Sequence, residues 1–168
     1  MNSIKEAQER RINILKKRPE MARSTGQTCV ELTSGTRCEV TEGDWKMVSD
    51  QPKSSGGNDE GPDPGFFGRG AVGACLVQGY ALKLALFDLT FQSIRVEIES
   101  DIDGLGSTGL DDTVPPGYQA LRYRVLIESD EEEAAILKAV EYADDHSPWL
   151  FNLTSAIPAE REVVVNPV

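Results

Sequence analysis

The residue best suited to chemistry is Cys75, which lies in an apolar, glycine-rich segment that runs from Gly65 to Val77. The thiolate form of a cysteine is a nucleophile that attacks the O–O bond of a peroxide and becomes a sulfenic acid. A second signal, His146-Ser147-Pro148-Trp149, lies near the C-terminus. Ser147 can donate a hydrogen bond to a sulfur atom, and it is also a good N-cap for a helix that starts at Pro148.

Each of these residues also has a purely structural interpretation, and the sequence leaves both open. A free cysteine often serves as a small buried hydrophobe. Ser147 can be an N-cap and nothing more, and His146 can be a helix C-terminal residue stabilised by the helix dipole. The aromatic residues Phe66, Phe67 and Trp149 flank the two segments, either as the rim of an apolar binding site or as part of a dimer interface.

The two segments resemble the OsmC/Ohr family, a group of thiol-dependent hydroperoxide reductases and related proteins. The resemblance covers roughly residues 26–166. It implies an α+β, OsmC-like fold with antiparallel sheets packed on a central apolar helix. It also implies an intertwined homodimer in which both subunits line each active site. The resemblance further implies that Cys75 is the catalytic residue. The binding residues expected around it are Ser147, His146, Phe66, Phe67, Trp149 and Arg69.

The chain departs from the family pattern at three positions. Ser147 stands where the family has a second cysteine, and Gly65 stands where it has a glutamate that orients an arginine toward the sulfur. The loop 51–63, which carries that arginine in the family, contains Lys53 and no arginine. Arg69 and Arg37 are the other cations considered for Cys75.

Two functions follow from this pattern. The first is a single-cysteine hydroperoxide reductase that acts on a small apolar hydroperoxide and is resolved by an external thiol. The second is a non-catalytic dimer of the same fold that binds a small apolar ligand at the subunit interface. Neither function needs a cofactor. Because His146 is the only histidine in the chain, we expect no metal site.

Charge and composition restrict the partners. The net charge of −11 disfavours nucleic acid, which requires a basic surface. No apolar stretch is long enough to span a membrane, and no secretory signal opens the sequence. Three cysteines do not make a disulfide framework, so a cytoplasmic, reducing location fits best. Residues 1–23 carry a balance of +4 and form a basic N-terminal arm, while 24–168 form the OsmC-like domain.

Hydrophobic periodicity predicts an ordered series of elements around these residues. A helix over 3–22 is followed by an antiparallel meander over 27–33, 36–42 and 44–50, and then by the loop 51–63. The predicted core elements are a long apolar helix over 64–86 and two alternating strands, 93–102 and 119–128, joined by an irregular connection. A capping box at Ser129–Glu132 predicts a helix over 130–145 that buries Ile136, Leu137, Val140 and Ala143. A shorter helix to about residue 156 and a strand at 163–165 complete the series.

The other two cysteines, Cys29 and Cys38, are predicted on neighbouring strands of the meander. With a two-residue turn at Ser34-Gly35, Cys38 would face Glu31. The two thiols would then be diagonal neighbours, too far apart for a disulfide bond. We therefore expect both cysteines to be structural.

Overall fold

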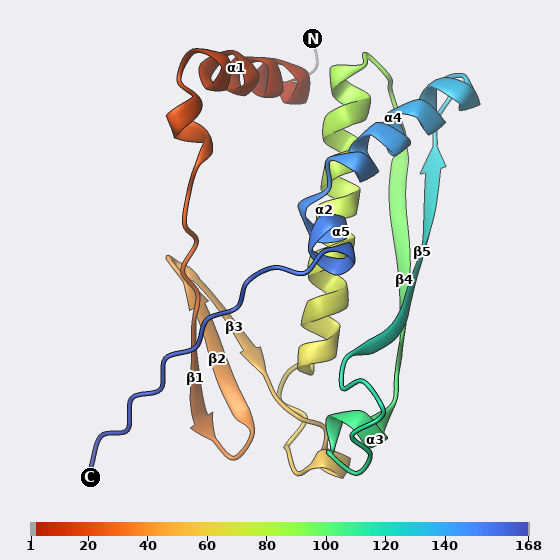
Figure 1. Ribbon diagram of the computed structural model, residues 1–168. Coiled ribbons are helices and arrows are strands. Elements are labelled where there is room, and N and C mark those ends of the chain that lie inside the picture. Colours follow the sequence, from red (N-terminus) through yellow and green to blue (C-terminus); the bar gives the residue numbers. More distant parts are fainter. Residues whose placement is uncertain (1–2, 168) are drawn as a thin grey trace.

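A computed structural model describes residues 3–167 of the chain (Figure 1). The helix α1 (Ser3–Lys17) and the 3-10 turn η1 (Pro19–Ala22) precede the strands β1 (Cys29–Ser34), β2 (Arg37–Glu42) and β3 (Trp45–Ser49). A second 3-10 turn, η2 (Lys53–Ser55), leads into the long helix α2 (Pro64–Leu86). The remaining elements are β4 (Ser93–Ile102), α3 (Gly104–Ser107), β5 (Tyr118–Glu128), α4 (Glu133–Asp145) and α5 (Pro148–Thr154).

The architecture is α+β, with two small antiparallel sheets, β1-β2-β3 and β4-β5. Figure 1 shows α2 at the centre, with β4 and β5 running alongside it and α4 and α5 crossing it. The β1-β2-β3 sheet stands on the other side of α2, and every residue of β1 is exposed. The sheet that packs on the central helix within one chain is therefore β4-β5.

The core is built on one stripe of α2. Val72, Leu76, Tyr80 and Leu84 recur every four residues and are each at most 1% exposed. The first three pack with Ala143 of α4 and with partly buried residues of β4, while Leu84 packs with Ile136 and Ala139 of α4. This spacing keeps the apolar side chains on one helical face, so burial of that face fixes α4 and β4 against α2.

Local contacts explain where α2 begins and why it contains glycines. The Asp63 carboxylate caps the helix by accepting a hydrogen bond from the Phe66 N–H at 2.8 Å, and Pro64 occupies the first turn. A Cβ added at Gly73 would lie 3.1 Å from Cδ1 of Ile98, and one at Gly68 would lie 2.9 Å from the Tyr118 hydroxyl. These two glycines therefore give β4 and β5 close access to the helix.

Two helix boundaries differ from the sequence prediction. The first helix ends at Lys17 instead of residue 22, because Pro19 cannot continue an α-helix and the chain tightens into η1. The helix α4 begins at Glu133 without the predicted capping box. Instead, the Ser129 hydroxyl donates to the Thr90 carbonyl at 2.6 Å and accepts from the Glu131 N–H at 3.1 Å, which ties the turn to the preceding strand connection.

The buried face of α4 also differs from the prediction. Ile136, Ala139 and Ala143 are its buried residues, whereas Leu137 is 58% exposed. The three buried residues lie three and four positions apart on one helical face, and Leu137 lies off that face.

The strands and their connections also differ from the sequence prediction. Cys38 pairs with Leu32, not with Glu31, because the turn includes a left-handed Gly35 and the register shifts between Leu32 and Ser34. The connection between β4 and β5 contains the short helix α3, capped by Asp103. The predicted strand at 163–165 does not form, and these three valines are extended and exposed. Cys29 pairs with Thr41, and the three cysteines are free thiols in the structure.

The loop that enters α2 is organised by one carboxylate. Asp50, which is 3% exposed, accepts hydrogen bonds from the Thr36 hydroxyl at 2.7 Å and from the backbone N–H groups of Gln51, Asn58 and Glu60. These donors, led by Thr36, lower the pKa of Asp50 from an ordinary value of 3.8 to about 2. Gly57 must be a glycine here, because an added Cβ would lie 1.8 Å from the Gln51 carbonyl oxygen.

We predict that Asp50 makes the stability of the fold sensitive to acid. Because the pKa of Asp50 is lower in the folded chain, its contribution is complete above about pH 4 and is lost as the pH falls toward 2. Asp50→Asn should therefore have a lower free energy of unfolding than the wild type at pH 6. This gap between the two proteins should narrow at pH 3. Urea unfolding at the two pH values measures that gap. A gap that stays constant would contradict the prediction, and Asp112→Asn, at an exposed position, controls for the loss of one negative charge.

Candidate functional site

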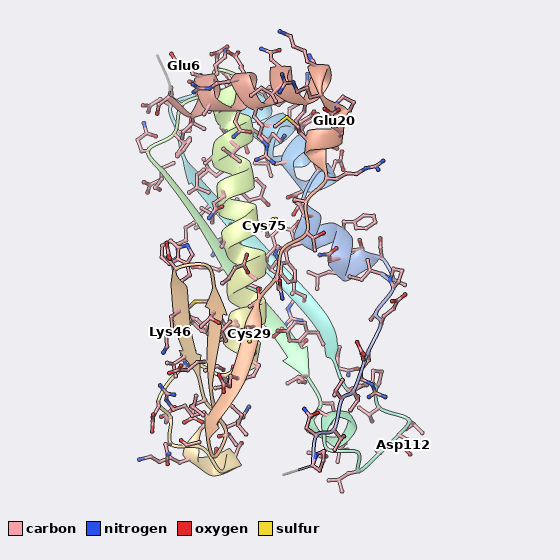
Figure 2. The ribbon with its side chains drawn as sticks, turned by 90° about the vertical axis from the view of Figure 1, so that its left-hand side faces the viewer. Glu6, Glu20, Cys29, Lys46, Cys75 and Asp112 are labelled. Carbon is pink, nitrogen blue, oxygen red and sulfur yellow. The ribbon has the colours of Figure 1, made fainter. Side chains whose placement is uncertain are left out.

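The candidate site forms where α2 meets the corner between α4 and α5. Cys75 lies midway along α2 and is half-buried (Figure 2). Its Sγ atom is 3.7 Å from Oγ of Ser147, the N-cap of α5, although the two residues are 72 positions apart in the sequence. Ser147 is 8% exposed. The fold therefore brings together the two segments that the sequence analysis singled out.

The Ser147 hydroxyl is oriented by the start of α5. The hydroxyl oxygen accepts a hydrogen bond from the Leu150 N–H at 3.4 Å. The backbone N–H of Ser147 donates to the Asp144 carbonyl at 3.0 Å. Pro148 follows in the first turn, where it needs no hydrogen-bond partner. Because the hydroxyl oxygen already accepts from the helix, its proton is available to be donated to the sulfur of Cys75.

A cavity of about 230 Å³ opens beside this pair. Its charged, polar or ionisable lining comes from α2 and from the corner between α4 and α5. The lining residues that carry such groups are Cys75, Gln78, Tyr80, Lys83, His146 and Ser147. The cavity is therefore an open pocket with a thiol, an imidazole, an amine and a hydroxyl on its walls.

His146 has one ring nitrogen committed to the backbone. Its Nδ1 lies 2.8 Å from the carbonyl oxygen of Tyr142. A carbonyl oxygen only accepts, so Nδ1 carries the proton, and Nε2 bears the lone pair whenever the ring is neutral. The imidazole also stacks on the Tyr142 ring, with centroids 4.2 Å apart, and Lys83 Nζ lies 5.2 Å from the centroid of that same ring.

A partly buried hydrogen-bond network holds the corner in place. Tyr80, which is fully buried, donates to one carboxylate oxygen of Asp144 at 2.7 Å, and Tyr123 of β5 donates to the other at 3.1 Å. Burial, reinforced by Asp144, raises the pKa of both phenols, so both remain hydrogen-bond donors at neutral pH. Asp144 in turn accepts the Ser147 N–H through its backbone, so the network fixes the serine relative to Cys75.

The two arginines considered from the sequence contact other side chains, away from Cys75. Arg69 Nη1 donates to the Ser100 hydroxyl of β4 at 3.4 Å, and Arg37 pairs with Glu60 at 2.9 Å. Lys53 is exposed in η2. Within the described part of the chain, the basic residue that lines the Cys75 cavity with His146 is Lys83. The sequence analysis missed it, although its spacing of eight residues from Cys75 places both on one face of a helix.

The aromatic candidates lie apart from the cavity within one chain. Phe66 and Phe67 sit in the first turn of α2, edge to face with centroids 6.2 Å apart, and Trp149 is on α5. Phe66 is 57% exposed and Trp149 is 38% exposed. None of the three lines the Cys75 cavity among residues 3–167.

Residues 3–167 contain neither a metal-binding cluster nor a membrane-spanning helix. No group of three or more histidine, cysteine, aspartate or glutamate side chains could hold a metal ion. No helix in this part of the chain is both long enough and apolar enough to cross a membrane.

Comparison with known proteins now decides the family. The family model for OsmC-like proteins matches residues 56–162, which include α2, both core strands, α4 and α5. The chain belongs to the OsmC-like family. No curated protein matches its sequence.

Solved structures agree with this OsmC-like assignment at the level of the fold. An OsmC-like protein from Mycoplasma pneumoniae superposes with a TM-score of 0.67 at 14% identity, over 78% of this chain and 88% of that one. An organic hydroperoxide resistance protein OsmC from Legionella pneumophila gives a TM-score of 0.56 at 14% identity, over 76% and 89% of the two chains.

Proposed function

We propose that this OsmC-like protein reduces a small apolar hydroperoxide with Cys75 as its single catalytic cysteine. The observation that carries the proposal is the 3.7 Å contact between Cys75 and Ser147 at the edge of an open cavity. The Cys75 thiolate attacks the terminal peroxide oxygen, so an S–O bond forms as the O–O bond breaks. The alkoxide leaves and takes up a proton to become an alcohol, and Cys75 becomes a sulfenic acid.

The serine at position 147 determines how the cycle ends. A second thiol there would condense with the sulfenic acid, but a hydroxyl cannot form a disulfide bond. Cys29 and Cys38 belong to the β1-β2-β3 sheet, far along the chain from α5. We therefore expect an external thiol to attack the sulfenic acid, releasing water and forming a mixed disulfide. A second thiol molecule then releases reduced Cys75 and completes the two-electron reduction.

The alternative function is a dimer of the same fold that binds a small apolar ligand without catalysis. It is favoured by the engagement of Arg37 and Arg69 with other side chains, which leaves the family's arginine role unfilled by either residue. Turnover of cumene hydroperoxide with an added thiol separates the two functions. Catalysis abolished by Cys75→Ser supports the reductase, and wild-type protein that binds apolar probes without turnover supports the alternative.

A homodimer in the cytoplasm is the proposed working form. Apolar side chains are exposed on the β1-β2-β3 sheet, including Trp45 at 80% and Leu32 at 66%. Exposed apolar surface of this kind is typical of an interface between subunits. The basic arm, residues 1–23, is proposed to add to that assembly, and three free thiols fit a reducing compartment.

We predict that the protein sediments as a dimer at micromolar concentration. Trp45→Lys should weaken dimerisation about tenfold or more, because a charge would be buried in the interface. Leu110→Lys is the matched control, since Leu110 is similarly exposed, at 77%, but lies in the connection between β4 and β5. A stable, folded wild-type monomer in analytical ultracentrifugation would rule out the proposed dimer.

We also predict that Ser147→Cys lets Cys75 form an intramolecular disulfide bond after peroxide treatment. The 3.7 Å separation of Sγ and Oγ is small enough for modest side-chain rotation to bring two sulfur atoms together. Mass spectrometry should find the peptides that contain residues 75 and 147 linked with the loss of two hydrogens. The wild type should instead yield sulfenic acid or its overoxidised products. If Cys75 stays reduced in both proteins, the thiol is inert and the reductase proposal fails.

A further inference from the structure

We infer that the cavity beside Cys75 binds a small carboxylate with an apolar body, and that the ammonium group of Lys83 binds the anionic end of this ligand. The wall of the cavity carries apolar side chains, the thiol and the ammonium of Lys83, and no aspartate or glutamate among the described residues. Binding of this kind is independent of catalysis, whereas a role for the site in choosing the substrate rests on the proposed function.

The charge of this wall contrasts with the charge of the whole chain. Aspartate and glutamate number 28 and lysine and arginine number 17, which gives the net charge of −11. An acidic surface repels anions, so an anion enters a pocket of such a protein only where local positive charge outweighs the repulsion. Lys83 supplies this positive charge, and no carboxylate on the described wall neutralises it.

The side chain of Lys83 is held in place without being neutralised. It is half-buried on α2, and its Nζ lies 5.2 Å from the centroid of the Tyr142 ring on α4. The Tyr142 ring also packs against Phe87, with centroids 5.4 Å apart, and against His146, at 4.2 Å. Within residues 3–167 no carboxylate forms an ion pair with Lys83. Because a lysine that is partly removed from water is usually paired, its ammonium is available to an anion from solution.

The neutral imidazole of His146 does not compete with Lys83 for this role. Its Nδ1 lies 2.8 Å from the Tyr142 carbonyl oxygen and carries the proton, so Nε2 of the neutral ring only accepts hydrogen bonds. A carboxylate oxygen also only accepts. Lys83 is therefore the group that donates to the anion.

The rest of the cavity suits a short apolar body. Leu82, Ala143 and Pro148 contribute apolar surface to its wall. Lys83 follows Cys75 by eight residues, which corresponds to about 12 Å along an α-helix. The volume of about 230 Å³ is below the roughly 300–1,000 Å³ of pockets for drug-sized ligands. The ligand that fits is therefore small and narrow, with its carboxylate at Lys83 and its apolar end toward Cys75.

The single histidine allows binding to be measured at the cavity itself by nuclear magnetic resonance. Since His146 lines the cavity, its imidazole C–H resonances should move when a ligand enters. The wild-type chain is titrated with octanoate and with octanamide, which has the same shape but no charge. Octanoate should bind about tenfold more tightly than octanamide. Equal affinities, or His146 resonances that do not move with millimolar octanoate, would overturn the inference.

Variants at position 83 test the role of the ammonium. Lys83→Met removes the charge and keeps most of the stem, so the affinity for octanoate should fall to that for octanamide, which should change little. Lys83→Arg keeps the charge and should retain the preference for octanoate. Lys138→Met is the matched control, because Lys138 is exposed on α4 and is not among the described residues that line the cavity. A preference that survives in Lys83→Met would contradict the role of Lys83.

These outcomes are distinguishable from those of the proposed function. If Cys75 is catalytic, a hydroperoxide that carries a carboxylate should have a lower KM than its uncharged analogue, and Lys83→Met should raise that KM without changing kcat. A preference for octanoate in a protein that does not turn over hydroperoxides would retain the carboxylate site and reject the reductase. Turnover of cumene hydroperoxide by a protein that binds the two probes equally would retain the reductase and reject the carboxylate site.

Discussion

The hydrogen-bonded packing of the α4–α5 corner on α2 is the interaction on which the site depends. Tyr80 lies in the buried stripe of α2 and donates to Asp144 at 2.7 Å. A buried hydroxyl without a partner costs about 1–3 kcal/mol, so Tyr80 and Asp144 fix the position at which α4 must end. Ser147 then follows three residues after Asp144, and its hydroxyl lies 3.7 Å from the sulfur of Cys75.

The apolar stripe of α2 lies directly beside the face that carries Cys75, and residues of both faces line the cavity. Leu76, Tyr80 and Leu84 face the core, while Cys75, Gly79 and Lys83 follow one another at intervals of four residues along the cavity. Burial of the first set holds the helix in place and so fixes the position of the second set along the cavity.

Periodicity was sufficient to predict the elements that are held by burial. The bounds of α2 followed from apolar spacing, and so did most of the core-facing residues of β4 and β5, although Ile102 and Tyr123 are exposed. Cys75 and Ser147 were selected by their resemblance to a family motif. Features set by tertiary contacts were not predictable in this way. Lys83 carries no motif, and the pairing of Cys38 with Leu32 depends on a bulge after the turn. The valines at 163–165 have strand propensity, but no strand within residues 3–167 pairs with them.

The central claim is that Cys75, alone among the three cysteines, is a reactive thiol at the Ser147 corner. The most direct measurement is to treat the reduced wild-type protein with cumene hydroperoxide in the presence of dimedone, which traps sulfenic acids, and to map the adducts by mass spectrometry. The account predicts an adduct on Cys75, little or none on Cys29 and Cys38, and loss of the Cys75 adduct when an external thiol is present from the start. Labelling of the exposed Cys29 with Cys75 left unmodified would contradict it.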